Sequence, residues 1–143
     1  MGAVNSILRG KGNIIFTIPP ETIVYNALEI MVEKNVSALL VMENDKLAGI
    51  FTERDYARKV ILKGKASKET KIGEIMTREL ITVSPETSLD SCMRLMTGKT
   101  IRHLPVVDNG QLAGIISIGD VVKYIIEEQK FIIENMEHYI TGS

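Results

Sequence analysis

Two segments of the chain combine a hydroxyl, a carboxylate and a helix start in a pattern suited to nucleotide binding. They are Gly49-Ile50-Phe51-Thr52-Glu53-Arg54-Asp55 and Gly114-Ile115-Ile116-Ser117-Ile118-Gly119-Asp120. A helix start presents unpaired N–H groups and a positive dipole end, which suit a phosphate. A carboxylate held there can accept both hydroxyls of a ribose, and the Thr or Ser hydroxyl can donate to a nearby sugar or phosphate oxygen. The chemistry that this pattern favours is therefore recognition of a ribose and its phosphate.

The same residues also fit a purely structural role. Thr-x-x-Asp or Ser-x-x-Asp before an apolar stretch is an N-cap signature, and a cap alone contributes about 1 kcal/mol. Either segment taken by itself is explained by capping. The nucleotide hypothesis depends on the pattern occurring twice.

The two segments belong to an internal repeat with a constant offset of 65 residues. Pro20-Glu21-Thr22 returns as Pro85-Glu86-Thr87, and Leu47-Ala48-Gly49-Ile50 returns as Leu112-Ala113-Gly114-Ile115. Asp55 returns as Asp120. Two copies of one unit therefore fill the chain.

Each copy predicts the order strand, helix, strand, strand, helix. Apolar runs that end in turn residues indicate strands, an apolar stripe with a period near 3.6 indicates a helix, and Asn44-Asp45 and Asn109-Gly110 indicate hairpin turns. Thr22 and Thr87 are the expected helix caps. The expected strands are 14–18, 38–42 and 47–51, then 80–83, 104–107 and 112–116; the expected closing helices begin near Glu53 and Ile118. The buried helix stripes are expected to include Ile23, Ala27, Leu28, Met31 and Val32, then Leu89, Cys92, Met93 and Met96.

The expected boundaries are 1–63 for the first repeat with its N-terminal segment, 64–71 for a polar linker, and 72–143 for the second repeat with an extended C-terminal helix. The second half of that helix, from Phe131 to Ile140, carries more apolar surface than so small a unit covers. Because large exposed apolar patches are unusual on monomers, we expect it to be buried against another chain.

Composition narrows the functional class. The chain has 143 residues, 45% of them hydrophobic, 17 basic and 18 acidic side chains, and one Cys. A single Cys excludes a disulfide framework, a net charge of -1 gives no strong field for nucleic acid, and no apolar run is long enough to span a membrane. We expect a cytoplasmic protein with neither a nucleic-acid nor a membrane partner.

The residues that could carry catalysis fit other roles. Cys92 lies on an apolar helical stripe with no base identifiable beside it, which is typical of a core residue. His103 and His138 lack the partners that a metal site needs, and no phosphate-binding Gly-rich loop ending in Lys-Ser or Lys-Thr is present. We therefore expect a protein that is not an enzyme and has no catalytic cofactor or metal.

The doubled Gly-h-h-(Ser/Thr)-x-x-Asp pattern, where h is apolar, together with Ile75-Met76-Thr77 and Arg102-His103-Leu104-Pro105-Val106-Val107-Asp108, resembles a tandem pair of CBS domains. The resemblance covers roughly 14–126 and extends to small stand-alone CBS-pair proteins. It implies an α/β (α+β) fold in which two β-α-β-β-α repeats pack through their sheets with pseudo-twofold symmetry. It also implies two clefts for AMP, ADP, ATP or another adenosyl ligand such as NAD or S-adenosylmethionine, and a homodimer.

The resemblance also assigns residues. It places the ribose carboxylate at Asp55 and Asp120, the hydroxyl at Thr52 and Ser117, and the phosphate contacts of the Asp55 cleft at Arg102 and His103. Arg54 is the corresponding cation for the Asp120 cleft. Adenine is expected on apolar walls, with Lys11 as a further phosphate contact and Arg9, Arg58 and Lys71 as weaker ones. The expected wall and lining residues are Ile18, Ala38, Leu40, Val83 and Pro105.

We expect a nucleotide-responsive regulatory module that signals to a separate partner protein. The competing interpretations are a module that dimerises and docks without a ligand, and a sensor of NAD or S-adenosylmethionine. In an interaction module the ribose Asp is expected to be lost, and here both copies keep it. Arg102 and His103 favour a phosphorylated ligand, and we expect AMP or ADP to bind first in the Asp55 cleft.

Overall fold

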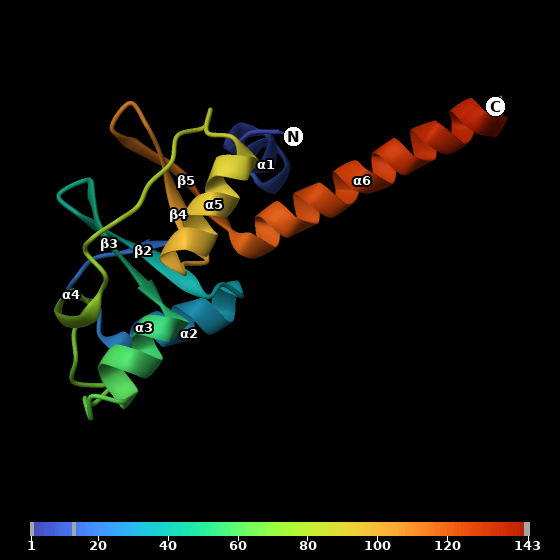
Figure 1. Cartoon of the computed structure of the whole chain (residues 1–143). Helices are drawn as coiled ribbons and strands as arrows, with labels where there is room; N and C mark the ends of the chain where they lie inside the picture. Colours follow the sequence, from blue (N-terminus) through green and yellow to red (C-terminus); the bar gives the residue numbers. More distant parts are fainter. Residues whose placement is uncertain (1, 13, 142–143) are drawn as a thin grey trace. The chain divides into compact units, whose positions relative to one another are not determined.

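The computed structural model describes residues 2–12 and 14–141, and the chain forms two compact units (Figure 1). Unit 1 is built from Met1–Asn13, Val83–Asp108 and Ala113–Ser143, and unit 2 from Ile14–Thr82 and Asn109–Leu112. Strands and helices occur in both, which confirms the mixed α/β class.

Unit 2 contains the first repeat. In its three-stranded sheet, in the order β1-β2-β3, the first pair is parallel and the second antiparallel. Its elements are β1 (Thr17–Ile18), α2 (Val24–Lys34), β2 (Ala38–Glu43), β3 (Lys46–Thr52), α3 (Glu53–Asp55), the π-helix η1 (Tyr56–Ile61) and α4 (Ile72–Ile75).

Unit 1 contains most of the second repeat. Its sheet pairs β4 with β5, and a parallel bridge between Val83 and Val106 stands where the first repeat pairs Ile18 with Val41. The expected strand 80–83 is thus reduced to one bridge. The elements are α1 (Val4–Lys11), α5 (Leu89–Lys99), β4 (His103–Asp108), β5 (Gln111–Ser117) and α6 (Ile118–Thr141).

The two hairpin turns are confirmed. Asn44 and Asp45 have φ of 52° and 61°, and Asn109 and Gly110 have φ of 51° and 79°. Asn, Asp and Gly tolerate this left-handed region better than other residues do, and the resulting turn suits the twist of paired strands.

The expected helix caps are wrong. Helix α2 has no side-chain cap, because the carbonyls of Thr70 and Ser67 accept its first N–H groups, from Val24 and Tyr25, at 2.8 and 2.9 Å. The linker 64–71 therefore packs onto this helix end. In α5 the cap is Ser88, whose side chain accepts from the Ser91 N–H.

The helix stripes are confirmed in part. Ala27, Met31, Leu89, Cys92 and Met96 are buried, and Ile23, Leu28 and Met93 are partly buried. Val32 is 83% exposed, so its expected burial is wrong. Val32 precedes the left-handed Asn35 that ends α2, and its side chain points away from the stripe.

The helix before each repeat packs with the other repeat. Helix α1 groups with unit 1 and α4 with unit 2. Three hydrogen bonds in each unit follow one scheme. Val4 N–H donates to Thr87 O, Asn5 N–H to Pro85 O and Leu89 N–H to Gly2 O in unit 1; Ile72 N–H donates to Thr22 O, Gly73 N–H to Pro20 O and Val24 N–H to Thr70 O in unit 2.

These bonds make α1 the counterpart of α4. In each unit an apolar side chain also packs against the Gly that opens the repeated motif, from within α1 in unit 1 and from the residue that ends α4 in unit 2. An added Cβ at Gly49 would lie 2.8 Å from Met76 Sδ, and one at Gly114 would lie 2.8 Å from Leu8 Cδ2. The close approach explains why both motifs begin with Gly.

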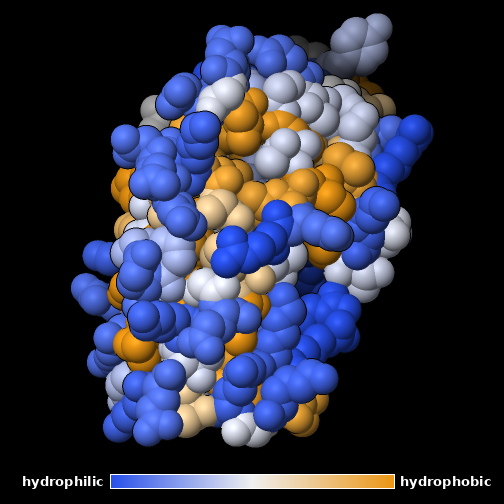
Figure 2. All heavy atoms as spheres, turned by 90° about the vertical axis from the view of Figure 1, so that its left-hand side faces the viewer, coloured by the Kyte–Doolittle hydropathy of each residue, from blue (hydrophilic) through white to orange (hydrophobic). Residues whose placement is uncertain are grey.

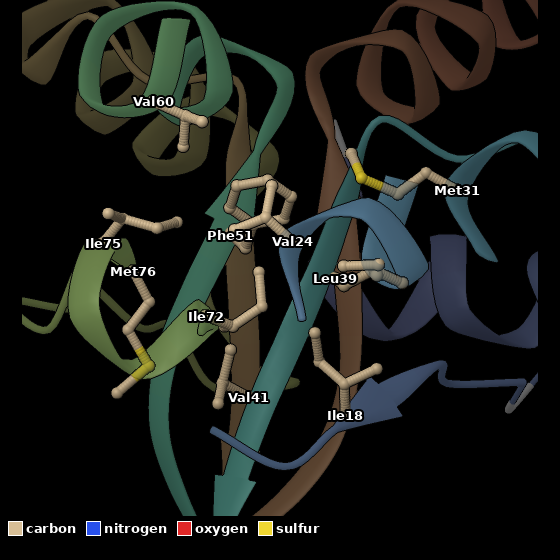
Figure 3. Packing of buried hydrophobic residues seen from close by; sticks show 11 residues of the cluster. Ile18, Val24, Met31, Leu39, Val41, Phe51, Val60, Ile72, Ile75 and Met76 are labelled. Carbon is tan, nitrogen blue, oxygen red and sulfur yellow. The ribbon is translucent and has the colours of Figure 1, made fainter. Parts of the chain in front are cut away.

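The core of unit 2 gathers side chains from its sheet, α2, η1 and α4 (Figure 3). Phe51 of β3 and Val24 of α2 are fully buried, as is Ile72 of α4. Burial of Ile72 and Met76 in this cluster holds α4 on the first repeat.

Helix α6 continues far beyond the part that packs on α1 and α5, and among the described residues of unit 1 no other helix or strand lies beside its second half (Figure 1). The long C-terminal helix is therefore confirmed. Its exposed apolar side chains are Val122, Ile126, Phe131, Ile132, Ile133, Met136, Tyr139 and Ile140.

Candidate functional site

Thr52 and Asp55 form a reciprocal cap at the start of α3. The Asp55 N–H donates to Thr52 Oγ1 at 3.1 Å, and the Thr52 N–H donates to Asp55 Oδ2 at 3.0 Å. The capping interpretation of the motif is thus confirmed in unit 2. The cap also fixes where the carboxylate lies, because its Oδ2 is tied to the backbone.

The second oxygen of Asp55 is also engaged. Thr77 Oγ1 donates to Asp55 Oδ1 at 3.0 Å, and Lys59 Nζ lies 3.2 Å from Oδ1 and 3.0 Å from Thr77 Oγ1. Asp55 is only 8% exposed. A buried carboxylate with this many donors is held in one orientation.

The motif in unit 1 has the same cap. The Asp120 N–H donates to Ser117 Oγ at 3.1 Å, and the Ser117 N–H donates to Asp120 Oδ2 at 2.8 Å. Both copies of the motif therefore start a helix at the expected residue and orient their Asp in the same way.

The cation beside Asp120 comes from α1. Lys11 Nζ lies 2.7 Å from Asp120 Oδ2 and donates to the Ile115 carbonyl at 3.0 Å. The Lys11 and Asp120 side chains are 36% and 24% exposed. The structure thus brings Lys11, expected as a phosphate contact, to the second copy of the motif.

The charge of Lys11 governs the ionisation of its partner. Burial raises the pKa of Asp120, but the hydrogen bond and charge of Lys11, together with the bonds from Ser117, outweigh it and hold the pKa below its ordinary value. Asp120 is therefore a carboxylate at neutral pH and an acceptor only.

His103, the first residue of β4, is half-buried and in electrostatic range of this cluster. Burial lowers the pKa of His103; Lys11 and Arg102 lower it as well, while Asp120 raises it. The imidazole is therefore mainly neutral at pH 7 and offers one donor and one acceptor. The structure thus brings His103 close to Lys11 and Asp120.

The two arginines lie at exposed positions. Arg102 precedes β4, and its carbonyl accepts from the Ile118 N–H at 2.9 Å, which joins it to the start of α6. Arg54 is in the first turn of α3 beside Asp55. The assignment of Arg102 and His103 to the Asp55 cleft, and of Arg54 to the Asp120 cleft, stays a prediction.

The expected wall residues are buried strand residues. In unit 2, Ile18, Ala38 and Leu40 are 4%, 8% and 1% exposed. In unit 1, Val83 is 6% exposed and its N–H donates to the carbonyl of buried Pro105. Their expected role as adenine walls stays a prediction.

Sequence reasoning missed Lys59 and Thr77 as members of the Asp55 cluster. Lys59 stands four residues after Asp55 on one helical segment, which is a spacing that favours an ion pair. That spacing could have predicted the ion pair from the sequence. No sequence pattern predicts the Thr77 contact, since it depends on α4 packing with the first repeat.

Two other kinds of site are absent from residues 2–12 and 14–141. No group of three or more His, Cys, Asp or Glu side chains is arranged to hold a metal ion. No helix there combines the length and the apolar character that crossing a membrane requires.

A family model described as "CBS domain" matches residues 13–62 and 72–127. The chain is 48% identical over 124 residues to the CBS domain-containing protein CBSX3, mitochondrial, of Arabidopsis thaliana, which covers 83% of this chain and 60% of that protein. The chain therefore spans less than two thirds of that relative.

Solved structures agree with this match. A putative signal-transduction protein with CBS domains from Burkholderia ambifaria is 49% identical, with a TM-score of 0.86 over 89% of this chain and 96% of that one. A CBS domain pair solved with 5′-methylthioadenosine and S-adenosyl-L-methionine is 27% identical, with a TM-score of 0.79 over 90% of this chain and 98% of that one.

Proposed function

Because this chain belongs to the CBS-domain family, we propose that it is a regulatory module that binds an adenine nucleotide, AMP, ADP or ATP, and signals to a partner protein by a change of conformation. The partner is a separate protein, and the chain itself catalyses no reaction. Binding shifts the conformation only if the nucleotide has unequal affinity for the two arrangements.

The observation that carries this proposal is the pair of oriented carboxylates. Asp55 and Asp120 each lie at a helix start, each is fixed by a reciprocal cap, and each has a lysine within 3.2 Å. A carboxylate can accept ribose hydroxyls, and a cation beside it can bind a phosphate. The related pair that holds 5′-methylthioadenosine and S-adenosyl-L-methionine supports an adenosyl ligand.

A nucleotide is favoured over an uncharged nucleoside or S-adenosylmethionine because of the cations. Lys11 lies 2.7 Å from Asp120 Oδ2, and the mainly neutral His103 is in electrostatic range of Lys11, Arg102 and Asp120. That group has more positive than negative charge, which favours a ligand with a phosphate. NAD also carries phosphate and remains a second candidate on the same ground.

A thermal-shift screen tests the proposal. AMP, ADP, ATP, NAD, adenosine and S-adenosylmethionine are each added to the full chain, and at least one nucleotide is expected to raise the melting temperature, since a ligand that binds only the folded state must stabilise it. Stabilisation by S-adenosylmethionine alone would contradict the choice of ligand. No stabilisation by any of them would favour a module that dimerises and docks without a ligand.

We also propose that the chain forms a homodimer, with α6 in the interface. The face that Figure 2 shows has hydrophobic side chains between hydrophilic ones, which is usual for any protein surface. The second half of α6 differs, because Ile132, Met136 and Ile140 are 42%, 58% and 77% exposed along one helix. We also propose that the protein is located in the cytoplasm.

A further inference from the structure

Lys11 reaches Asp120 from a separate element, and this sets the second motif apart from the first. It is the last residue of α1, whose other end is held by buried Val4 and Ile7 and by backbone bonds to the segment before α5. The exposed C-terminal end of α1 brings a full charge to the carboxylate.

The corresponding contact in unit 2 is made by a neutral group. There the segment that follows α4 offers the Thr77 hydroxyl to Asp55, and the lysine, Lys59, comes from the same helical segment as the Asp. Position 124, which corresponds to Lys59, is a Tyr. Lys11 is therefore the ion-pair partner of Asp120 within the described residues of unit 1.

From this geometry we infer that Lys11 makes the Asp120 half of the module discriminate between phosphorylated and uncharged adenosyl ligands. The inference rests on the proposed function. In the free chain the ammonium donates to Asp120 Oδ2 and the Ile115 carbonyl. A ribose hydroxyl that binds Oδ2 competes with it there.

The outcome of that competition depends on the ligand. An uncharged nucleoside leaves the ammonium with a weakened partner in a partly buried place, which opposes binding. A nucleotide supplies a phosphate oxygen, and the ammonium exchanges one anionic acceptor for another. Lys11 therefore weakens the binding of adenosine and strengthens the binding of AMP.

Calorimetry with AMP and with adenosine tests this inference. All proteins carry Asp55→Asn, so that Asp120 is the remaining carboxylate of the pair, and folding is checked by thermal unfolding. Lys11→Met keeps the length of the side chain and removes its charge. The control is Lys99→Met, the same substitution at the exposed last residue of α5, another helix of unit 1.

Lys11→Met is expected to weaken the binding of AMP by about tenfold, the loss of roughly one charge-assisted hydrogen bond, and to tighten the binding of adenosine. Lys99→Met is expected to keep both affinities within about twofold, a small fraction of one such bond. If Lys11→Met binds AMP and its ratio of AMP affinity to adenosine affinity equals that of the protein with Lys11, the inference is overturned and the proposed function remains intact. If neither ligand binds with or without Lys11, the proposed function fails for this half and the inference fails with it.

Discussion

The Lys11 ammonium lies 2.7 Å from Asp120 Oδ2, and this contact ties the last residue of α1 to the first turn of α6 across 109 positions of sequence. The helix that precedes the first repeat thus contributes to the motif of the second. Because α4 has the matching place in unit 2, the two motifs share one plan but differ in the charge of the group that each helix segment brings.

Breaking this ion pair should loosen one end of α1. Since both side chains are partly exposed, we expect Lys11→Met to lower the free energy of unfolding by about 0.5–1 kcal/mol. Hydrogen exchange is expected to speed up at the last residues of α1, including the Gly12 N–H that donates to Leu8 O. Urea unfolding and exchange measured by mass spectrometry check this, with Arg9→Met as control. Equal exchange in Lys11→Met and wild type would show that the contact does not hold the helix.

The two motif glycines should respond differently to alanine. A Cβ at Gly49 would lie 2.8 Å from Met76 Sδ and 2.9 Å from the Thr77 backbone O, whereas at Gly114 the three nearest atoms belong to the Leu8 side chain. A side-chain end can rotate but the backbone of α4's segment must shift, so we expect Gly49→Ala to destabilise by about 1–3 kcal/mol and Gly114→Ala by less. Urea unfolding measures the free energy of unfolding of both variants. An equal loss in the two variants would contradict this explanation.

The lowered pKa of His103 predicts that the protein loses stability in mild acid. Burial, Lys11 and Arg102 hold its pKa below 6.5, against the opposing effect of Asp120. The unfolded chain then binds the proton more readily, so the free energy of unfolding falls as pH drops below 6.5 toward the lowered pKa of the folded state. We expect a smaller drop between pH 7 and 5.5 in His103→Gln, measured by urea unfolding. Identical drops in the two proteins would assign the pH dependence to other groups.

Much of the local structure follows from the repeat. The offset of 65 residues predicts both hairpins and both closing helices, because apolar runs and Asn-Asp or Asn-Gly turns are local signals. The expected helix cap at Thr22 was wrong for a tertiary reason, and the one at Thr87 for a local reason. Carbonyls of the segment 64–71 satisfy the start of α2, and Ser88 lies one residue nearer to α5 than Thr87 does.

The grouping of α1 with unit 1 could not be read from the pattern. Nothing in the order of residues shows that α1 packs beside Thr87 and Gly114 rather than beside the repeat that follows it. The same limit hid Thr77. The carboxylates were predictable because caps are local, and the partners that other elements bring to them were not.

The exposed apolar side chains of α6 predict a dimer interface that added charges should disrupt. We expect wild type to sediment as a dimer and the double variant Ile132→Lys and Met136→Lys to sediment as a monomer, because burying two ammonium groups in an apolar interface is unfavourable. Glu134→Lys, a charge change at an exposed position on the same helix, is the control. If the double variant still sediments as a dimer, α6 does not form the interface.

The assignment of Arg102 to the first motif is tested by binding. Asp55→Ala combined with Arg102→Ala is expected to abolish the first AMP binding event seen by calorimetry, because ribose and phosphate contacts are lost together. Lys63→Ala, an exposed lysine beyond η1, serves as the control. Undiminished first binding in the double variant would overturn the assignment.

The central claim is that Asp55 and Asp120 are nucleotide-binding carboxylates as well as caps. Calorimetry of AMP with wild type and with the double variant Asp55→Asn and Asp120→Asn tests it most directly, since Asn keeps the size of the side chain and loses the charge. We expect saturable binding by wild type and none by the double variant while it remains folded. Equal binding by the two proteins, or none by either, would contradict the claim.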